Sequence, residues 1–180
     1  LRYRGIDIYE IAENSDFMET AYLLIYGHLP TEQQREEFNE KIVRQALLHE
    51  NMKVQFQGFP PYAHPMAVLT AMINSMSCFH PHLLELDSDE KFINAIARLL
   101  SKVRTIAAFS YKHSIGEPLI YPTANRSYSE NFLHMMFSAP NRDYQPDPDV
   151  IKALDLIFVL HADHEQNCST STVRMVGSSQ

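Results

Sequence analysis

The chain has 180 residues, of which 45% are hydrophobic, enough to form the core of one domain. Its net charge of −7 and the lack of a basic cluster argue against a nucleic-acid partner, because phosphate binding requires a clustered positive surface. The longest apolar stretches are interrupted by polar residues and are shorter than the roughly 18 residues of a membrane span. We therefore expect a soluble protein.

Cysteine content and the chain ends bear on the cellular compartment. Cys78 and Cys168 are the two cysteines and lie far apart, which is typical of reduced, buried thiols in the cytosol rather than of a disulfide framework. Leu1 is not an initiator Met, and no signal or transit pattern follows it. Gln180 comes directly after Gly177-Ser178-Ser179 without a cap, a charged tail or a linker, so we expect a fragment that lacks both ends.

Signals for helix starts and stops recur along the chain, while strand signals are sparse. There are only five glycines and no sustained alternation of apolar and polar residues. Residues 1–5 resemble the tail of a strand. The helices that we expect cover residues 8–12, 17–26, 31 to about 50, 66 to about 79, 87–90 through 113, from 127 or 129 to 136, and from 150 onward. The sequence therefore predicts an all-α fold without an internal domain boundary.

The most informative segment is an apolar run that ends in a dense polar cluster. Apolar residues at helical spacing from Val150 predict a core helix, which is apolar on nearly every side by Leu156. The Ser/Thr-rich stretch after the cluster has small side chains and suits a second, tightly packed helix. The cluster itself contains His161, Asp163, His164, Glu165 and Asn167.

His161 and His164 are three positions apart, so on a helix both would project from one face. Three interpretations compete for this pair. They are core histidines bonded to Asp163 or to backbone, metal ligands, or donors to a carboxylate or carbonyl substrate. The metal interpretation is weaker, because the His-Glu-x-x-His order of zincins is absent and no further ligand group is evident. The residue pattern alone does not separate the other two.

Four segments, in this order and joined by similar sequence, resemble citrate synthase in its bacterial hexameric branch. The segments are 17–30 (FMETAYLLIYGHLP), 64–66 (HPM), 111–116 (YKHSIG) and 161–172 (HADHEQNCSTST). The match covers essentially the whole chain, which corresponds to under half of a usual family member. The resemblance implies that residues 1–180 are part of the large helical domain, with the small domain and the remainder downstream.

The resemblance also implies an activity, that of an acyltransferase, citrate (Si)-synthase. Such enzymes condense acetyl-CoA with oxaloacetate and water to give citrate and CoA in the tricarboxylic acid cycle, with acetyl-CoA as a substrate and with no cofactor or metal. The family's two catalytic histidines and its base Asp lie beyond Gln180, so we expect no catalytic residue in this chain and no activity from it alone. We further expect a cytoplasmic bacterial homo-oligomer, a dimer assembled into a hexamer, without nucleic-acid or membrane partners.

Within this chain the resemblance assigns one substrate-binding element. It implies that His164 donates a hydrogen bond to oxaloacetate, that Asn167 lies near the same pocket, and that His161 is a buried, supporting residue. An imidazole donor suits a dianionic keto acid, because a charge-assisted hydrogen bond is stronger in a dry cleft than in water.

Some members of the hexameric branch are inhibited by NADH, and three cations here match their nucleotide pocket. Arg44, Arg98 and Lys102 are these candidate remnants, and the alternative is a solvated helix face. Four positions depart from the pattern and argue against inhibition. Leu47, His80, Thr123 and Asn141 stand where the inhibited enzymes carry Met, Tyr, Arg and Cys.

Two hypotheses from other classes stay open at this point. One is an all-α metal-dependent hydrolase of the His-Asp type, with His161, Asp163 and His164 as ligands. The other is a non-catalytic helical interaction module, because the chain carries no complete catalytic set. A Gly-Pro-x-His-Gly motif and a later Asp downstream would favour the synthase over both.

Overall fold

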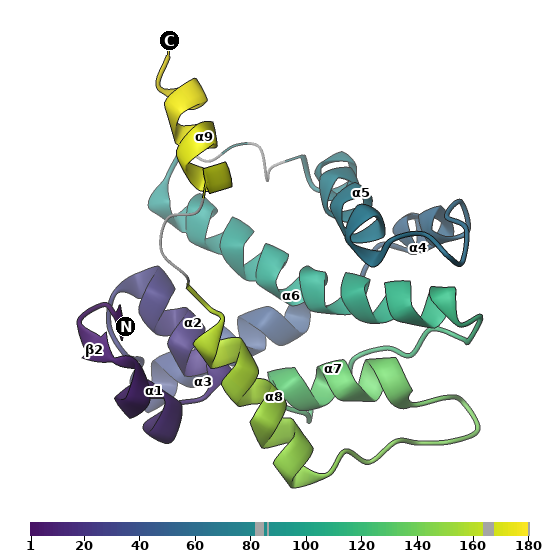
Figure 1. The fold of residues 1–180 in the computed structure, drawn as a ribbon, viewed down its shortest axis with the longest axis horizontal. Coiled ribbons are helices and arrows are strands. Elements are labelled where there is room, and N and C mark those ends of the chain that lie inside the picture. The colour runs from purple at the N-terminus through teal and green to yellow at the C-terminus, as the bar shows by residue number, and fades with distance from the viewer. Residues whose placement is uncertain (82–84, 86, 164–167, 180) are drawn as a thin grey trace.

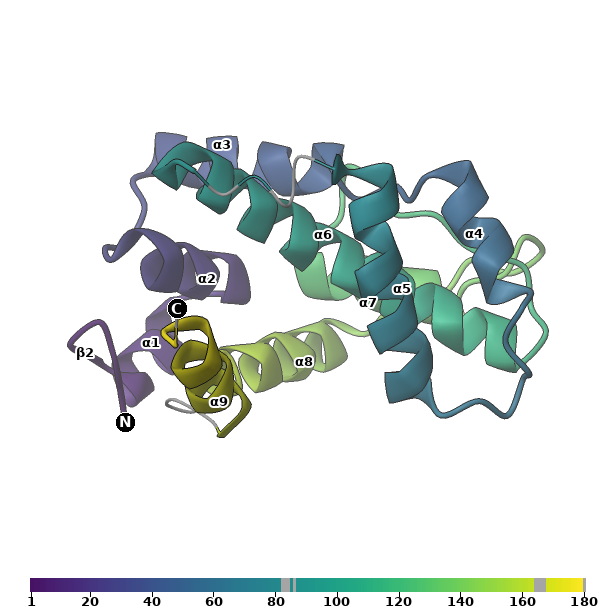
Figure 2. The same ribbon diagram turned by 90° about the horizontal axis from the view of Figure 1, so that it is seen from above.

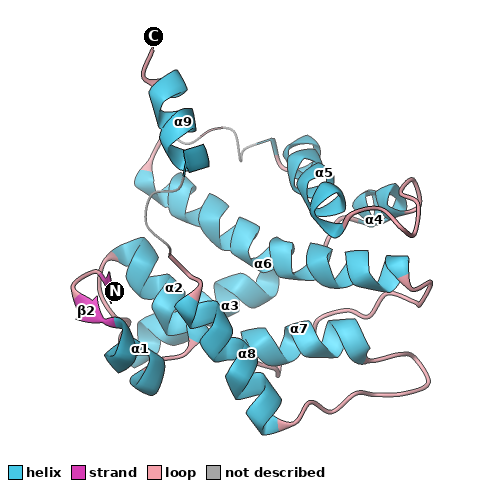
Figure 3. Cartoon of the chain, in the orientation of Figure 1, coloured by secondary structure: helices cyan, strands magenta, loops and turns pink. Residues whose placement is uncertain are grey.

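The computed structural model describes residues 1–81, 85, 87–163 and 168–179. Within these ranges the chain is built of helices apart from one small hairpin of two-residue strands, so the all-α prediction is confirmed (Figure 3). The hairpin pairs β1 (Arg2–Tyr3) with β2 (Ile6–Asp7) in antiparallel register. The helices are α1 (Ile8–Asn14), α2 (Phe17–Tyr26), α3 (Glu32–Arg44), α4 (Glu50–Phe56), α5 (Pro65–Phe79), α6 (Asp89–Ser114), α7 (Tyr128–Phe137), α8 (Pro148–Leu160) and α9 (Cys168–Gly177).

Local capping signals set the ends of α2 and the start of α3, as predicted. Asp16 and Glu19 form a reciprocal capping box at the start of α2, and Gly27 ends that helix with a φ of 87°. A side chain at such a φ would be strained, so glycine suits this position. Thr31 and Gln34 form the same kind of box at the start of α3.

The expected single helix from residue 31 to about 50 is wrong, because α3 ends at Arg44 and a short helix, α4, follows. The amides of Gln45 and Ala46 still bond back to the last turn of α3, and beyond them the link is held by contacts with α6. Thr105 Oγ1 donates to the Ala46 carbonyl at 2.8 Å, and the Lys102 ammonium donates to the Leu47 carbonyl. Tertiary hydrogen bonds therefore replace the local ladder here.

The long helix α6 crosses the middle of the molecule, with α4 and α5 on one side and α7 and α8 on the other (Figure 1). A view turned by 90° shows α3 running alongside the first half of α6 (Figure 2). Among the described residues, three apolar clusters hold this arrangement together. The first joins α4, α5 and α6, the second joins α2, α3 and α6, and the third joins the hairpin, α1, α2 and α8.

The C-terminal helices are more exposed than predicted. In α8 the only buried residue is Val159, and Ile157 is 50% exposed, because α8 packs on one side only, against α1, α2 and α7. The expected tight packing of the following helix is also wrong, since α9 buries no residue and extends from the rest of the molecule (Figure 1).

Cys78 and Cys168 are exposed free thiols, and the prediction that they are buried is wrong. Within the described residues, no helix combines the length and apolar character of a membrane span.

Candidate functional site

The polar cluster begins where α8 ends. α8 stops at Leu160, and the backbone N–H of His161 donates to the Ile157 carbonyl at 3.0 Å as the helix closes. The helix therefore does not extend through Ala162 and Asp163, and the predicted shared face of His161 and His164 depends on a residue outside the described ranges. Both predicted oxaloacetate-binding residues, His164 and Asn167, lie outside the described residues, as does Glu165.

His161 is exposed, which corrects the expectation that it is buried. Its Nδ1 lies 2.8 Å from the Ile157 carbonyl oxygen, so this nitrogen carries the hydrogen and donates it. The same carbonyl accepts from the His161 amide, so the ring gives it a second hydrogen bond at the helix end. The His161 ring is thus bound to its own helix and supports the start of the cluster.

The hydroxyl group of Tyr3 reaches the same place from the other end of the chain. It lies 3.0 Å from the Val159 carbonyl and 3.2 Å from the Asp163 carbonyl, and it accepts a hydrogen bond from the Asp163 amide at 3.3 Å. Tyr3 is 1% exposed and packs with Leu23 and Val159 in the third apolar cluster. The sequence analysis missed this residue, because the contact spans about 156 positions and has no local signal.

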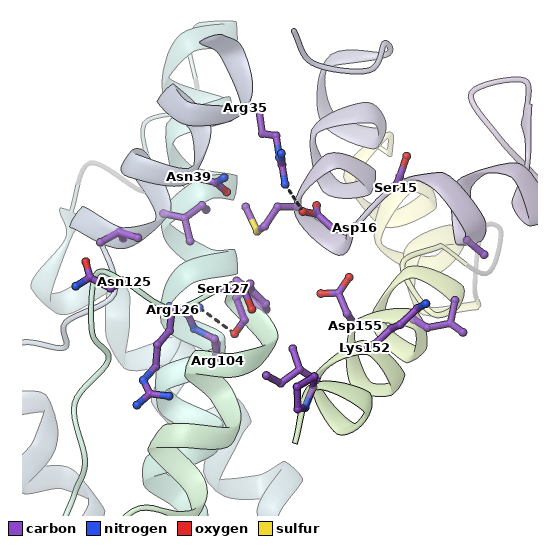
Figure 4. Close-up of a pocket in the computed structure, with 18 of the residues that line it drawn as sticks. Ser15, Asp16, Arg35, Asn39, Arg104, Asn125, Arg126, Ser127, Lys152 and Asp155 are labelled. Carbon is purple, nitrogen blue, oxygen red and sulfur yellow. Dashed lines mark hydrogen bonds and ion pairs between the residues drawn. The ribbon is translucent and has the colours of Figure 1, made fainter. Parts of the chain in front are cut away.

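A cavity of about 780 Å³ lies between α3, α6, the start of α7 and α8 (Figure 4). Much of its charge is already paired. Arg35 binds Asp16 at 2.9 Å, and the Asp155 carboxylate accepts from the Phe17 amide at 2.8 Å and from the Ser129 hydroxyl at 2.6 Å. Of the predicted site residues that the structure describes, His161, Arg44, Arg98 and Lys102, none lines this cavity. The described part of the cluster, His161 to Asp163, therefore lies outside the cavity lining.

The three candidate cations of a nucleotide pocket gather around the end of α3. Arg44 is exposed and pairs with Glu40 at 2.8 Å, while Arg98 Nε donates to Gln45 Oε1 at 2.9 Å. Lys102 is only 4% exposed, and burial together with the neighbouring Arg98 lowers its pKa to about 8. Lys102 is thus a buried residue and not part of a solvated face.

Metal coordination needs several donor side chains directed at one point. Across residues 1–163 and 168–179, leaving out positions 82–84 and 86, no three His, Cys, Asp or Glu side chains gather in this way. His164, a ligand in the metal-hydrolase hypothesis, lies outside these ranges.

Comparison with known proteins identifies close relatives. The family model described as citrate synthase, C-terminal domain, matches residues 1–180. Citrate synthase 1 of Mycobacterium tuberculosis, in strains CDC 1551 / Oshkosh and ATCC 25618 / H37Rv, is 50% identical over 181 residues, which cover 100% of this chain and 42% of the relative. The chain therefore spans less than half the length of these relatives.

Solved structures show the same likeness. The citrate synthase from Pyrobaculum aerophilum superimposes with a TM-score of 0.86 and 31% identity, covering 98% of this chain and 44% of that one. The citrate synthase from Thermotoga maritima MSB8 gives a TM-score of 0.80 at 31% identity, with the same coverage. The arrangement of helices is therefore one that known enzymes share.

Proposed function

The chain belongs to the citrate synthase family, and from this we propose that the protein containing it condenses acetyl-CoA with oxaloacetate and water to give citrate and CoA. The observation that carries the proposal is the match over all 180 residues, which includes the polar cluster after α8. On this proposal residues 1–180 contribute to the large helical domain, and acetyl-CoA is a substrate rather than a cofactor.

We propose that His164 donates a hydrogen bond to oxaloacetate, with Asn167 near the same pocket and His161 in support. The described neighbours fit this assignment. The hydrogen bonds of the Tyr3 hydroxyl and the His161 ring add to the backbone hydrogen bonds at the end of α8, so the chain enters the cluster from a well-held position. A charge-assisted hydrogen bond to a dicarboxylate gains strength when it is held in place before the substrate arrives.

The catalytic acid and base are proposed to lie in other parts of the protein. By this proposal the isolated chain binds neither substrate productively and releases no CoA, since binding groups alone do not replace proton transfer. Exposed apolar side chains such as Met66, Ile157 and Val173 support burial against further helices or other subunits. We propose a cytoplasmic homo-oligomer, a dimer assembled into a hexamer.

A thiol-release assay tests this function. The full-length protein should release free CoA only when both acetyl-CoA and oxaloacetate are present, and the 180-residue chain alone should release none. Release that does not need oxaloacetate would point to a thioesterase instead. Turnover by the chain alone would overturn the proposed location of the catalytic groups.

A further inference from the structure

The N-terminal hairpin and the end of α8 meet through one buried hydroxyl group. Tyr3 Oη is within hydrogen-bonding distance of the Val159 carbonyl (3.0 Å) and the Asp163 carbonyl (3.2 Å), and it accepts from the Asp163 amide (3.3 Å). It also lies 3.5 Å from the Leu160 carbonyl. The hydroxyl thus contacts two carbonyl groups in the last turn of α8, and it also contacts the backbone of Asp163, three residues after the helix ends.

The other end of the Tyr3 side chain is held firmly. Tyr3 pairs with Ile6 in the hairpin, and its ring packs with Ile8, Ile11 and Leu23. With 1% of the residue exposed, the ring is enclosed by close-packed neighbours that restrict the movement of its hydroxyl oxygen. The backbone of Asp163 is therefore located relative to the hairpin and not only relative to α8.

This location matters because the chain has left helical geometry at His161. Beyond a helix end the backbone is not directed by the helical ladder, so another contact must set the direction in which it continues. The Asp163 amide and carbonyl both meet the Tyr3 hydroxyl, and the next residue along the chain is His164.

We propose that Tyr3 is a positioning residue for oxaloacetate, which acts by fixing the backbone of Asp163 from which His164 follows. The inference rests on the proposed function of His164. Tyr3 is not proposed to contact the substrate. Its hydroxyl orients the turn before substrate binds, so its loss should weaken oxaloacetate binding while the rest of the site stays intact.

The test replaces Tyr3 by Phe in the full-length protein, which removes the hydroxyl and keeps the ring. We expect the KM for oxaloacetate to rise roughly three- to tenfold, the effect of one buried hydrogen bond, with the KM for acetyl-CoA changed by less than about twofold. A matched control is Tyr128→Phe, since the Tyr128 hydroxyl donates to a distant backbone carbonyl, that of Leu100, at 2.8 Å.

The two variants lose the same chemical group and should lower Tm to a similar degree. A purely structural role for Tyr3 would give both variants the same kinetics, and this result would overturn the inference. Equal increases in both KM values for Tyr3→Phe would overturn it as well, because the effect would then not be specific to oxaloacetate.

Hydrogen exchange provides a second measurement that does not need activity. In Tyr3→Phe, a short peptide containing Asp163 should exchange its amide hydrogens faster than in the parent, and the same peptide in Tyr128→Phe should not. Unchanged exchange would show that the Tyr3 hydroxyl does not hold this turn, and the inference would fail.

A His164→Ala variant separates this inference from the function on which it rests. If His164→Ala retains parental affinity for oxaloacetate, the proposed role of His164 fails and the positioning role falls with it. If His164→Ala loses affinity and Tyr3→Phe does not, only the positioning role of Tyr3 fails.

Discussion

The ammonium group of Lys102 in α6 donates a hydrogen bond to the main-chain carbonyl of Leu47, in the link between α3 and α4. Thr105, one helical turn further along α6, donates to the neighbouring Ala46 carbonyl at 2.8 Å. These two bonds satisfy backbone acceptors of the link, which have no helical partner. The Lys102 ammonium is therefore already bonded to the protein backbone, whereas binding a phosphate would require an available cation.

This pairing leads to a first prediction, on regulation. NADH should not inhibit CoA release by the full-length protein, because binding its phosphates with Lys102 would leave the Leu47 carbonyl buried without a donor, at a cost of about 1–3 kcal/mol. Assays at rising NADH and fixed acetyl-CoA test this. Saturable inhibition that disappears in Arg98→Gln would show that these cations do form a nucleotide pocket.

The second prediction concerns pH. Burial lowers the Lys102 pKa to about 8 from its ordinary value of 10.5, so between these values the unfolded chain binds more protons than the folded one. The contribution of Lys102 to stability therefore rises as pH increases from about 8 to about 10.5. Lys102→Met should abolish this part of the rise in Tm. Parallel Tm profiles of parent and variant over this range would contradict the assignment.

The third prediction concerns a buried cation in α6. Lys112 has a fully buried side chain whose Nζ donates to the Ser138 carbonyl at 2.6 Å and pairs with Glu117 at 2.5 Å. Lys112→Met leaves the Ser138 carbonyl buried without this donor, so we expect a loss of about 1–3 kcal/mol in the free energy of unfolding. The control is Lys91→Met. In the parent protein the Lys91 side chain is 47% exposed and pairs with Asp87. This surface pair should contribute less than about 1 kcal/mol. Equal effects would show that the Lys112 contacts add nothing beyond a surface pair.

The fourth prediction concerns His161. Because the ring is exposed and bonds the Ile157 carbonyl of its own helix, His161→Ala should cost less than about 1 kcal/mol and leave oxaloacetate kinetics within about threefold of the parent. His28→Ala is a matched control, since His28 is also exposed and its Nδ1 lies 2.9 Å from the Leu29 carbonyl. A much larger kinetic effect of His161→Ala than of His28→Ala would mean that His161 is the residue that binds oxaloacetate.

Features encoded within one or two helical turns were predictable from the sequence. Asp16 and Gly27 mark the ends of α2, and Thr31 marks the start of α3, because their capping interactions involve residues three or four positions away. The break after Arg44 was not predictable in this way. It depends on hydrogen bonds from Lys102 and Thr105, which are more than 50 positions along the chain.

The same contrast applies to the candidate site. The cluster after α8 stood out in the sequence, because polar side chains follow an apolar run, and the family resemblance supplied the role proposed for His164. The end of α8 at Leu160, before the cluster, was not predicted, since periodicity does not say where a helix stops. Tyr3 had no signal at all, because its partner atoms are backbone groups at the far end of the chain.

The most direct test of the account is the oxaloacetate dependence of CoA release by the full-length protein and its His164→Ala variant. Loss of one charge-assisted hydrogen bond to the substrate should lower kcat/KM for oxaloacetate by about ten- to a hundredfold, with little change in Tm. A His164→Ala protein with parental kcat/KM and parental Tm would contradict the proposed role of this histidine in oxaloacetate binding.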